Sequence, residues 1–272
     1  TSRGCPFHCA YCHNMFGKNI RFKSAQKVFD EIKYLVKKYK IEALEIWDDV
    51  FNYDKNRLLE ICRMIRESDL SLGLSFSNGI RADILDEAVV DALVDAGAQR
   101  INFGIESGTD RIQKVLCKNQ DLERVERIVR YVASKGNVIT GGFFIIGNPT
   151  ETKEEMLQTI EYASKLPLDV ASFFACTPNP GTKLYDMLSD EIKASIARIP
   201  PERFSYHESA FDISCVSHKE VRKQLKLAHL KFYFNMRRIY NLLRKVVLMD
   251  IVKNGYLVVR YILMSKTRLW YK

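Results

Sequence analysis

The chain has 272 residues, of which 47% are hydrophobic and 28% charged. This ordinary globular composition supplies enough apolar material for one large domain or two small ones. No signal peptide opens the sequence and no apolar run is long enough to span a membrane, so we expect a cytoplasmic protein. Four of the seven cysteines stand far apart along the chain, which excludes a disulfide framework and favours a reducing compartment.

The net charge of +9 is concentrated at the C-terminal end. Residues 219–272 contain 14 Lys and Arg against two acids, whereas residues 1–218 contain 28 Lys and Arg against 31 acids. The basic character therefore belongs to the C-terminal segment alone.

Short apolar segments alternate with longer amphipathic ones along most of the chain. Helical spacing of apolar residues, with Ser24 as a candidate N-cap, predicts a first helix over Ser24–Tyr39. Strands are then predicted at Ala43–Trp47, Leu72–Phe76, Arg100–Ile105, Val138–Ile146 and Asp169–Ala175. The intervening helices are expected at Asp54–Glu67, at Leu85–Ala96, between Asp110 and Lys135, from near Glu151, and near Lys183–Leu188. This alternation predicts a parallel sheet with right-handed crossover helices, which is an α/β fold.

The two ends of the chain differ from this pattern. A cysteine-rich loop leads directly into the first helix, so we expect a sixth strand just before Thr1 and interpret the chain as N-terminally truncated. The alternation stops at Pro200-Pro201. We therefore expect a core domain over residues 1–199, with its first strand largely missing, and a basic helical extension over residues 200–272.

Polar residues follow the predicted strands at the end where a parallel α/β barrel places its active site. They are Asp48, Asp49, Ser77, Asn78, Glu106, Ser107, Gly147, Asn148, Thr177 and Asn179. Loops are generally polar, so one such pair is a weak signal. The adjacent Asp48 and Asp49 are a stronger one, because neighbouring carboxylates repel each other unless a cation or several donors lie nearby.

The loop RGCPFHCAYCHN places Cys5, Cys9 and Cys12 in a C-x3-C-x2-C pattern. Thiolates at this spacing can ligate zinc or iron. A structural zinc site would need His8 or His13 as its fourth ligand, and a redox pair would leave one cysteine unexplained. An iron–sulfur cluster held by three thiolates would keep one iron open for catalysis. The spacing favours the cluster and leaves zinc as the alternative.

The loop TSRGCPFHCAYCHN resembles the signature of the radical S-adenosylmethionine (radical SAM) superfamily, in which three cysteines hold a 4Fe-4S cluster. The segments RINFGIESG, GGFFIIGNPTET and TPNPGTKLY also resemble that superfamily, particularly its branch associated with a cobalamin-binding domain. These segments occur in the family's order between residues 1 and 188. The resemblance implies a partial (β/α)6 TIM-like barrel with a helical C-terminal extension.

The resemblance also implies the chemistry. Cys5, Cys9 and Cys12 would hold the cluster, whose open iron binds S-adenosylmethionine (SAM). An electron from an external donor such as flavodoxin or ferredoxin would then split SAM to give a 5′-deoxyadenosyl radical, which takes hydrogen from a small-molecule substrate. Cobalamin would be supplied by a domain upstream of these residues.

Several residues match SAM-binding positions of the family. Tyr11 matches an aromatic position near adenine, and Asp48 and Asp49 stand where many members have Gly-Gly-Glu facing the SAM ammonium, with Asp49 favoured for that contact. Glu106 and Ser107 resemble a pair near the ribose and carboxylate. The remaining expected contacts are Asn78 and Arg81 nearby, and Gly142 and Gly147 in a segment that lies against adenine.

The isolated cysteines show no second cluster motif, so no auxiliary iron–sulfur centre is expected. Cys62 lies on the apolar stripe of its helix and is expected in the core. Cys176 ends a predicted strand and is expected in the core or lining the pocket, at the edge of the site.

The basic extension begins with helical spacing over Val221–Val247, followed by the apolar run Tyr256–Met264. One interpretation is a helical cap on the barrel with a solvated basic face. Another is peripheral contact with an anionic membrane, anchored by Trp270 and Tyr271. Nucleic-acid binding is not favoured, because basic charge alone is a weak signal and no RNA-binding module is recognised.

The sequence therefore predicts a radical SAM enzyme, and two reactions fit the resemblance. These are cobalamin-dependent methyl transfer and cyclisation, on a lipid or tetrapyrrole-like small molecule. The alternatives from other classes are a zinc-stabilised binding module and a protein whose basic tail docks it to membrane or RNA.

Overall fold

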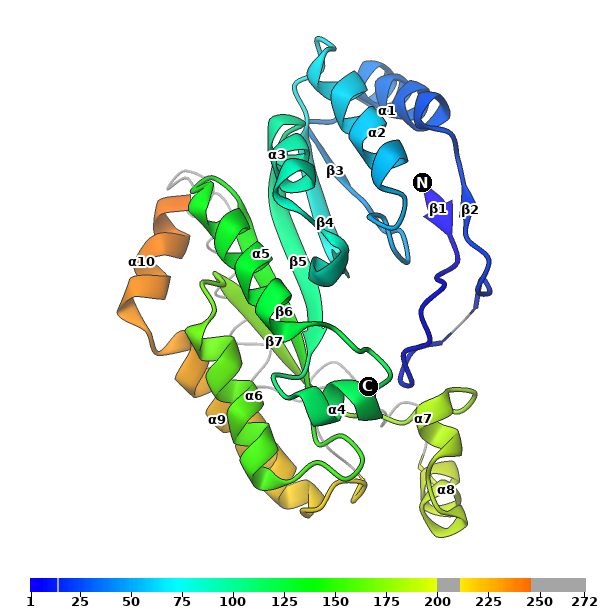
Figure 1. Cartoon of the computed structure of the whole chain (residues 1–272), viewed down its shortest axis with the longest axis vertical. Coiled ribbons are helices and arrows are strands. Elements are labelled where there is room, and N and C mark those ends of the chain that lie inside the picture. The colour runs from blue at the N-terminus through cyan, green and yellow to red at the C-terminus, as the bar shows by residue number, and fades with distance from the viewer. Residues whose placement is uncertain (14, 200–210, 246–272) are drawn as a thin grey trace.

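The computed structural model describes residues 1–13, 15–199 and 211–245. Its centre is a parallel sheet in the order β3-β4-β5-β6-β7 (Figure 1). These strands are Ala43–Glu45, Gly73–Ile80, Ala98–Glu106, Ile139–Ile146 and Val170–Ala175. Within the described residues no backbone ladder joins β3 to β7, so the sheet is an open part of a barrel. The predicted α/β class and its five parallel strands are confirmed.

Helices connect successive strands and begin at polar N-caps. They are α1 (Ala25–Tyr39), α2 (Lys55–Arg66), α3 (Glu87–Asp95), α4 (Asp110–Val115), α5 (Leu122–Ser134) and α6 (Lys153–Lys165). The hydroxyl of Ser24 accepts a hydrogen bond from the backbone of Lys27 and caps α1, as predicted. The helix predicted from Leu85 begins at Glu87 instead, because Leu85 is extended after a 3-10 turn (Ala82–Ile84) and Asp86 is the N-cap.

Two short elements follow β7. Helix α7 (Lys183–Asp186) is shorter than predicted, and α8 (Asp190–Ala197) was not predicted from the sequence. A two-residue antiparallel ladder between β1 (Ser2–Arg3) and β2 (Arg21–Phe22) was also not predicted. Strands this short show no alternation that a pattern could reveal. The ladder closes the base of the cysteine loop.

The core lies between the sheet and its helices. Phe76, Phe103, Phe144 and Phe173 come from four neighbouring strands and are each at most 1% exposed. Cys62 packs with them in the same apolar cluster, which confirms its expected place in the core. Burial of side chains of this size is the main stabilising contribution to such a fold. The sheet therefore provides a rigid base for the loops at its edge.

The C-terminal segment forms two helices instead of the single helix predicted over Val221–Val247. Helix α9 (His218–Tyr233) packs against β7 and α6, and α10 (Met236–Lys245) follows after a break (Figure 1). The side-chain oxygen of Asn235 accepts a hydrogen bond from the backbone N–H of Arg238 and starts the new helix. The run Tyr256–Met264, the anchors Trp270 and Tyr271, and the predicted boundary at Pro200-Pro201 lie outside the described residues.

Two cations of α10 are buried rather than solvated. The Arg238 guanidinium is 8% exposed and donates to the carbonyl oxygens of residues 168, 164 and 166 at 2.8, 3.0 and 3.3 Å, and to that of Phe232. Lys245 Nζ lies 2.7 Å from the buried Asp169 carboxylate. Part of the basic charge therefore holds the extension to the sheet. Among the described helices, none is long and apolar enough to cross a membrane.

Candidate active site

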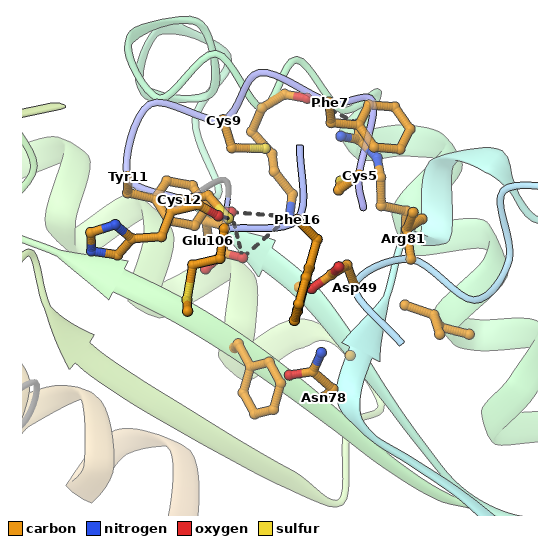
Figure 2. Close-up of a pocket in the computed structure, with 18 residues that line it drawn as sticks. Cys5, Phe7, Cys9, Tyr11, Cys12, Phe16, Asp49, Asn78, Arg81 and Glu106 are labelled. Atoms are coloured by element: carbon orange, nitrogen blue, oxygen red, sulfur yellow. Dashed lines mark hydrogen bonds and ion pairs between the residues drawn. The ribbon is translucent and has the colours of Figure 1, made fainter. Parts of the chain in front are cut away.

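A cavity of about 390 Å³ lies between the cysteine loop and the C-terminal ends of β3, β4 and β5 (Figure 2). The loop forms one side of the cavity and Asn78 lies at the other. The lining residues are Cys5, Phe7, Cys9, Tyr11, Cys12, His13, Met15, Phe16, Asp49, Val50, Asn78, Gly79, Ile80, Arg81, Gly104, Glu106, Lys118 and Phe143. The strand ends therefore meet the loop as the parallel-barrel rule predicts.

All three cysteines of the loop face this cavity. Burial raises the pKa of the Cys5 and Cys12 thiols above the ordinary value, and the neighbouring Cys9 raises both further. A bound metal reverses this effect because it stabilises the thiolate. Three thiols around one cavity fit a metal cluster held between them. In the described ranges, no three Cys, His, Asp or Glu side chains are arranged around a single metal ion.

The two adjacent aspartates point to different places. Asp48 is 4% exposed, and its carboxylate accepts hydrogen bonds from the α-amino group of Thr1 and from the hydroxyls of Thr1 and Ser2. Asp49 lines the cavity, and its Oδ2 accepts a hydrogen bond from the Gly4 N–H at 2.8 Å. Of the two, Asp49 is therefore the carboxylate that can meet a ligand.

Glu106 is aimed into the cavity by an irregular strand end. The register of β5 against β6 shifts between Gly104 and Glu106, and Glu106 has φ 71°, a value that is uncommon outside glycine. Its Oε1 accepts a hydrogen bond from the Tyr11 hydroxyl at 2.9 Å. It also lies 3.2 Å from Lys118 Nζ, which is itself 3.1 Å from the Tyr11 hydroxyl. Figure 2 shows the interactions of Glu106 beneath the loop.

Asn78 and Arg81 also line the cavity, and both are already bonded to protein groups. Asn78 donates from its side chain to the carbonyl of Asp48 at 3.0 Å. The Arg81 guanidinium binds both carboxylate oxygens of Asp83, at 3.0 and 2.7 Å, and lies 3.8 Å from the ring centre of Phe7. Arg81 therefore fixes the cysteine loop through a cation–π contact, with most of its donors used.

Besides Asp48, three predicted SAM contacts lie outside the cavity lining. Ser107 is buried and hydrogen-bonds with Thr109 and Thr159. A Cβ on Gly142 would meet Leu168, and one on Gly147 would meet Val221, so both glycines face packed side chains. Their contact with SAM remains a prediction.

Cys176 is buried and is not among the residues that line the cavity. It is 3% exposed and packs in an apolar cluster with Ala10 and Ile145. Burial raises the pKa of its thiol well above the ordinary value. Because Ala10 belongs to the cysteine loop, Cys176 lies near the edge of the site as expected, but apolar side chains cover its thiol and it does not line the cavity.

Sequence reasoning missed Lys118, Phe7 and Phe143, which all line the cavity. Lys118 lies in the connection between α4 and α5, where a lysine is ordinarily a solvated surface residue. Here it is 8% exposed. Phe143 lies within β6. No spacing in the sequence distinguishes these residues from their neighbours.

An open parallel α/β barrel with three cysteines over a cavity at its strand ends has the arrangement of a barrel enzyme whose site lies at the carboxyl ends of the strands. The model of the family described as the radical SAM superfamily matches residues 1–163, which is more than half of the chain. The chain therefore belongs to the radical SAM superfamily and is an enzyme. Members of this superfamily use a 4Fe-4S cluster and SAM.

Curated relatives include methyltransferases and a cyclase. An uncharacterised methyltransferase of Pyrococcus horikoshii is 30% identical over 275 residues, covering 100% of this chain and 57% of that protein. The cytidylyl-2-hydroxyethylphosphonate methyltransferase of Streptomyces wedmorensis is 35% identical, covering 68% of this chain and 36% of that protein. An anaerobic magnesium-protoporphyrin IX monomethyl ester cyclase of Rubrivivax gelatinosus is 25% identical, with coverages of 71% and 35%. The chain thus spans about half, or less, of the length of these relatives.

A solved structure supports the fold. The radical SAM methyltransferase TsrM of Kitasatospora setae, with cobalamin and a 4Fe-4S cluster bound, matches with a TM-score of 0.63 and 23% identity. The match covers 82% of this chain and 42% of that one. At this identity the likeness concerns the fold, and it agrees with the barrel-like sheet described above.

Proposed function

We propose that this chain is the SAM-cleaving part of a cobalamin-dependent radical SAM methyltransferase that acts on a small molecule. The observation that carries the proposal is the cavity itself, where three cysteines face Asp49 and Glu106 across a space at the strand ends. The methyltransferase relatives support the reaction class. Cyclisation on a tetrapyrrole-like or lipid substrate is the second candidate, which the cyclase relative supports.

The chain's own residues would divide the work as follows. Cys5, Cys9 and Cys12 would hold the cluster as thiolates. With SAM bound and an electron delivered by a flavodoxin- or ferredoxin-like donor, the cluster would supply a 5′-deoxyadenosyl radical. The Asp49 carboxylate would attract the SAM ammonium, and Glu106 would accept hydrogen bonds from the ligand's hydroxyls.

The apolar part of the cavity would protect a reactive intermediate. Phe7, Phe143, Val50 and Ile80 line it beside the polar groups. Such side chains exclude water from the cavity and so keep an organic radical from reacting with solvent.

Anaerobic reconstitution with iron and sulfide tests the cluster and the cleavage. We expect a brown protein that forms 5′-deoxyadenosine from SAM and dithionite. Cys9→Ala should abolish that product, whereas Cys215→Ala, which changes an exposed cysteine outside the cavity, should retain it. Asp49→Asn should weaken SAM binding by about tenfold, as expected for the loss of one charge-assisted hydrogen bond. A product that survives Cys9→Ala contradicts the proposal, and one colourless zinc per chain would support the binding module instead.

Cobalamin use and the reaction type need the full-length protein. We expect hydroxocobalamin to co-elute with it on gel filtration, and the label from methyl-labelled SAM to appear in the product. Cyclisation would leave the product unlabelled. A full-length protein that retains no cobalamin contradicts the cobalamin-dependent part of the proposal.

We also propose that the extension rests on the cytoplasmic face of an anionic membrane. Around the break between α9 and α10, Phe234 is 91% exposed and Met236 79% exposed, beside the exposed Arg237. Apolar side chains flanked by cations are typical of interfacial helices. Flotation with vesicles of phosphatidylcholine and phosphatidylserine tests this: we expect binding that Phe234→Glu weakens. Equal flotation of the variant and wild type would contradict it.

A further inference from the structure

Three of the five non-glycine residues with positive φ in the described part of the chain lie around one corner of the cavity. Glu106, Cys117 and Asn119 have φ of 71°, 51° and 49°, which places three non-glycine residues in the left-handed region. Two of them flank Lys118, and the third carries the carboxylate that Lys118 meets at 3.2 Å. Cys117 follows the end of α4, where a left-handed residue is common, and asparagine tolerates that region. The strain therefore lies at Glu106, and strain of this kind persists only where surrounding contacts over-determine the backbone.

The contacts that hold this backbone pass through Gln113, which is 1% exposed. Its side-chain amide donates to the carbonyl oxygens of Ile105 and Ser107, both at 2.7 Å. These are the residues on either side of Glu106. The backbone carbonyl oxygen of Gln113 accepts hydrogen bonds from the backbone N–H groups of Lys118 at 3.0 Å and Asn119 at 3.3 Å. One buried residue therefore ties the Glu106 turn to the Lys118 turn.

Arg81 adds a second tie to the same turn. Its Nη2 donates to the carbonyl oxygen of Lys118 at 2.9 Å, while Nε and Nη2 bind Asp83. The position of Lys118 is thus determined from two elements, α4 through Gln113 and the end of β4 through Arg81. A lysine on the surface would need neither the Gln113 contact nor the Arg81 contact.

The charges of the cavity explain what this arrangement does. Asp49 and Glu106 face the cavity together with three cysteines, which become thiolates when they hold a metal. Lys118 offsets that negative charge from a position where water is largely excluded. An ammonium has three donors, and Lys118 Nζ reaches the Tyr11 hydroxyl and Glu106 while Lys118 lines the cavity.

We propose that Lys118 is a positioning residue for SAM, which fixes the Glu106 carboxylate and the Tyr11 hydroxyl at the cavity wall before the ligand arrives. Gln113 holds the Glu106 turn and the Lys118 turn in place through its hydrogen bonds. This inference rests on the proposed function, because it requires SAM to occupy the cavity. Preorganisation of this kind lowers the cost of ordering side chains on binding.

SAM affinity, measured by equilibrium dialysis on the anaerobically reconstituted protein without reductant, tests the role apart from turnover. We expect Lys118→Met to bind SAM at least about tenfold more weakly, with unchanged iron content and cluster absorbance. Lys118→Arg should recover part of the affinity because it retains the charge. The matched control is Lys114→Met, an exposed lysine of α4, which should bind like wild type.

A double-variant cycle with Glu106→Gln separates positioning from general stability. If Lys118 acts through Glu106, the double variant binds SAM no more weakly than the weaker single variant. Wild-type affinity in Lys118→Met, or additive losses in the cycle, would overturn the inference while leaving the proposed function intact. Should Lys118→Met fail to fold, Lys118→Arg and Glu106→Gln carry the same cycle. Failure of the wild-type protein to bind SAM would contradict the proposed function and this inference together.

Discussion

Replacing Arg238 by methionine tests whether the basic extension is part of the folded core. Methionine keeps the apolar stem of the side chain and removes every donor. The four carbonyl oxygens that Arg238 binds would then lose their charged partner, and its contact with the Phe232 ring at 3.6 Å would be weakened. At about 1 kcal/mol for each hydrogen bond, the lost contacts amount to about 4 kcal/mol.

Part of this loss is recovered in the variant. Burial lowers the pKa of Arg238, which shows that desolvation of the cation opposes folding, and an uncharged side chain avoids that cost. We therefore expect the free energy of unfolding to fall by about 2–4 kcal/mol. Urea unfolding followed by far-UV circular dichroism measures it.

Arg237→Met is the matched control. Arg237 is the neighbouring residue on α10 and is exposed, so its replacement should change stability by about 0.5 kcal/mol or less. Equal urea midpoints for the two variants would refute the reasoning, because the buried hydrogen bonds would then contribute nothing. They would also favour a solvated extension that is independent of the sheet.

Two further predictions concern the loops that shape the sheet edge. Burial raises the pKa of the Glu151 carboxyl from 4.5 to about 7, so the folded state binds its proton more tightly than the unfolded state. The free energy of unfolding therefore falls as pH rises through this window, by about 3 kcal/mol at most. Glu151→Gln has no proton to lose, so its free energy of unfolding, measured in urea, should rise relative to that of wild type between about pH 5 and about pH 8. A difference in free energy of unfolding that does not change with pH would contradict this prediction. Gly97 has φ 96°, and a Cβ there would lie 2.4 Å from the carbonyl oxygen of Leu72, so Gly97→Ala should cost about 2–4 kcal/mol. Gly136→Ala, at φ 78° with open space around it, should cost about 1 kcal/mol, and equal thermal shifts for the two would show that the clash is relieved.

The strand and helix order was predictable because it rests on local patterns. Apolar spacing and N-caps such as Ser24 are properties of neighbouring residues, and the structure retains them. Element ends were less accurate, as at Leu85, where a competing cap at Asp86 starts the helix later. The break at Asn235 was missed because the apolar spacing continues on both sides of it.

The candidate site was predictable only in its outline. The choice between Asp48 and Asp49 depends on distant partners, since Asp48 is bound by Thr1 and Ser2 whereas Asp49 lines the cavity. Glu106 reaches the cavity through a register shift and a positive φ, which no periodicity reveals. Lys118 lies twelve residues after Glu106, in the connection between α4 and α5, and Gln113 holds its backbone in place.

The sequence by itself determined the alternating α/β order and the cysteine loop, because both are encoded in spacing over a few residues. Only the tertiary structure decided which polar side chains share the cavity and which cations are buried. Those outcomes depend on contacts between residues far apart in the chain, such as Tyr11 with Glu106 and Arg238 with the carbonyl oxygen of Leu168. A local pattern carries no information about such pairs until the sheet brings them together.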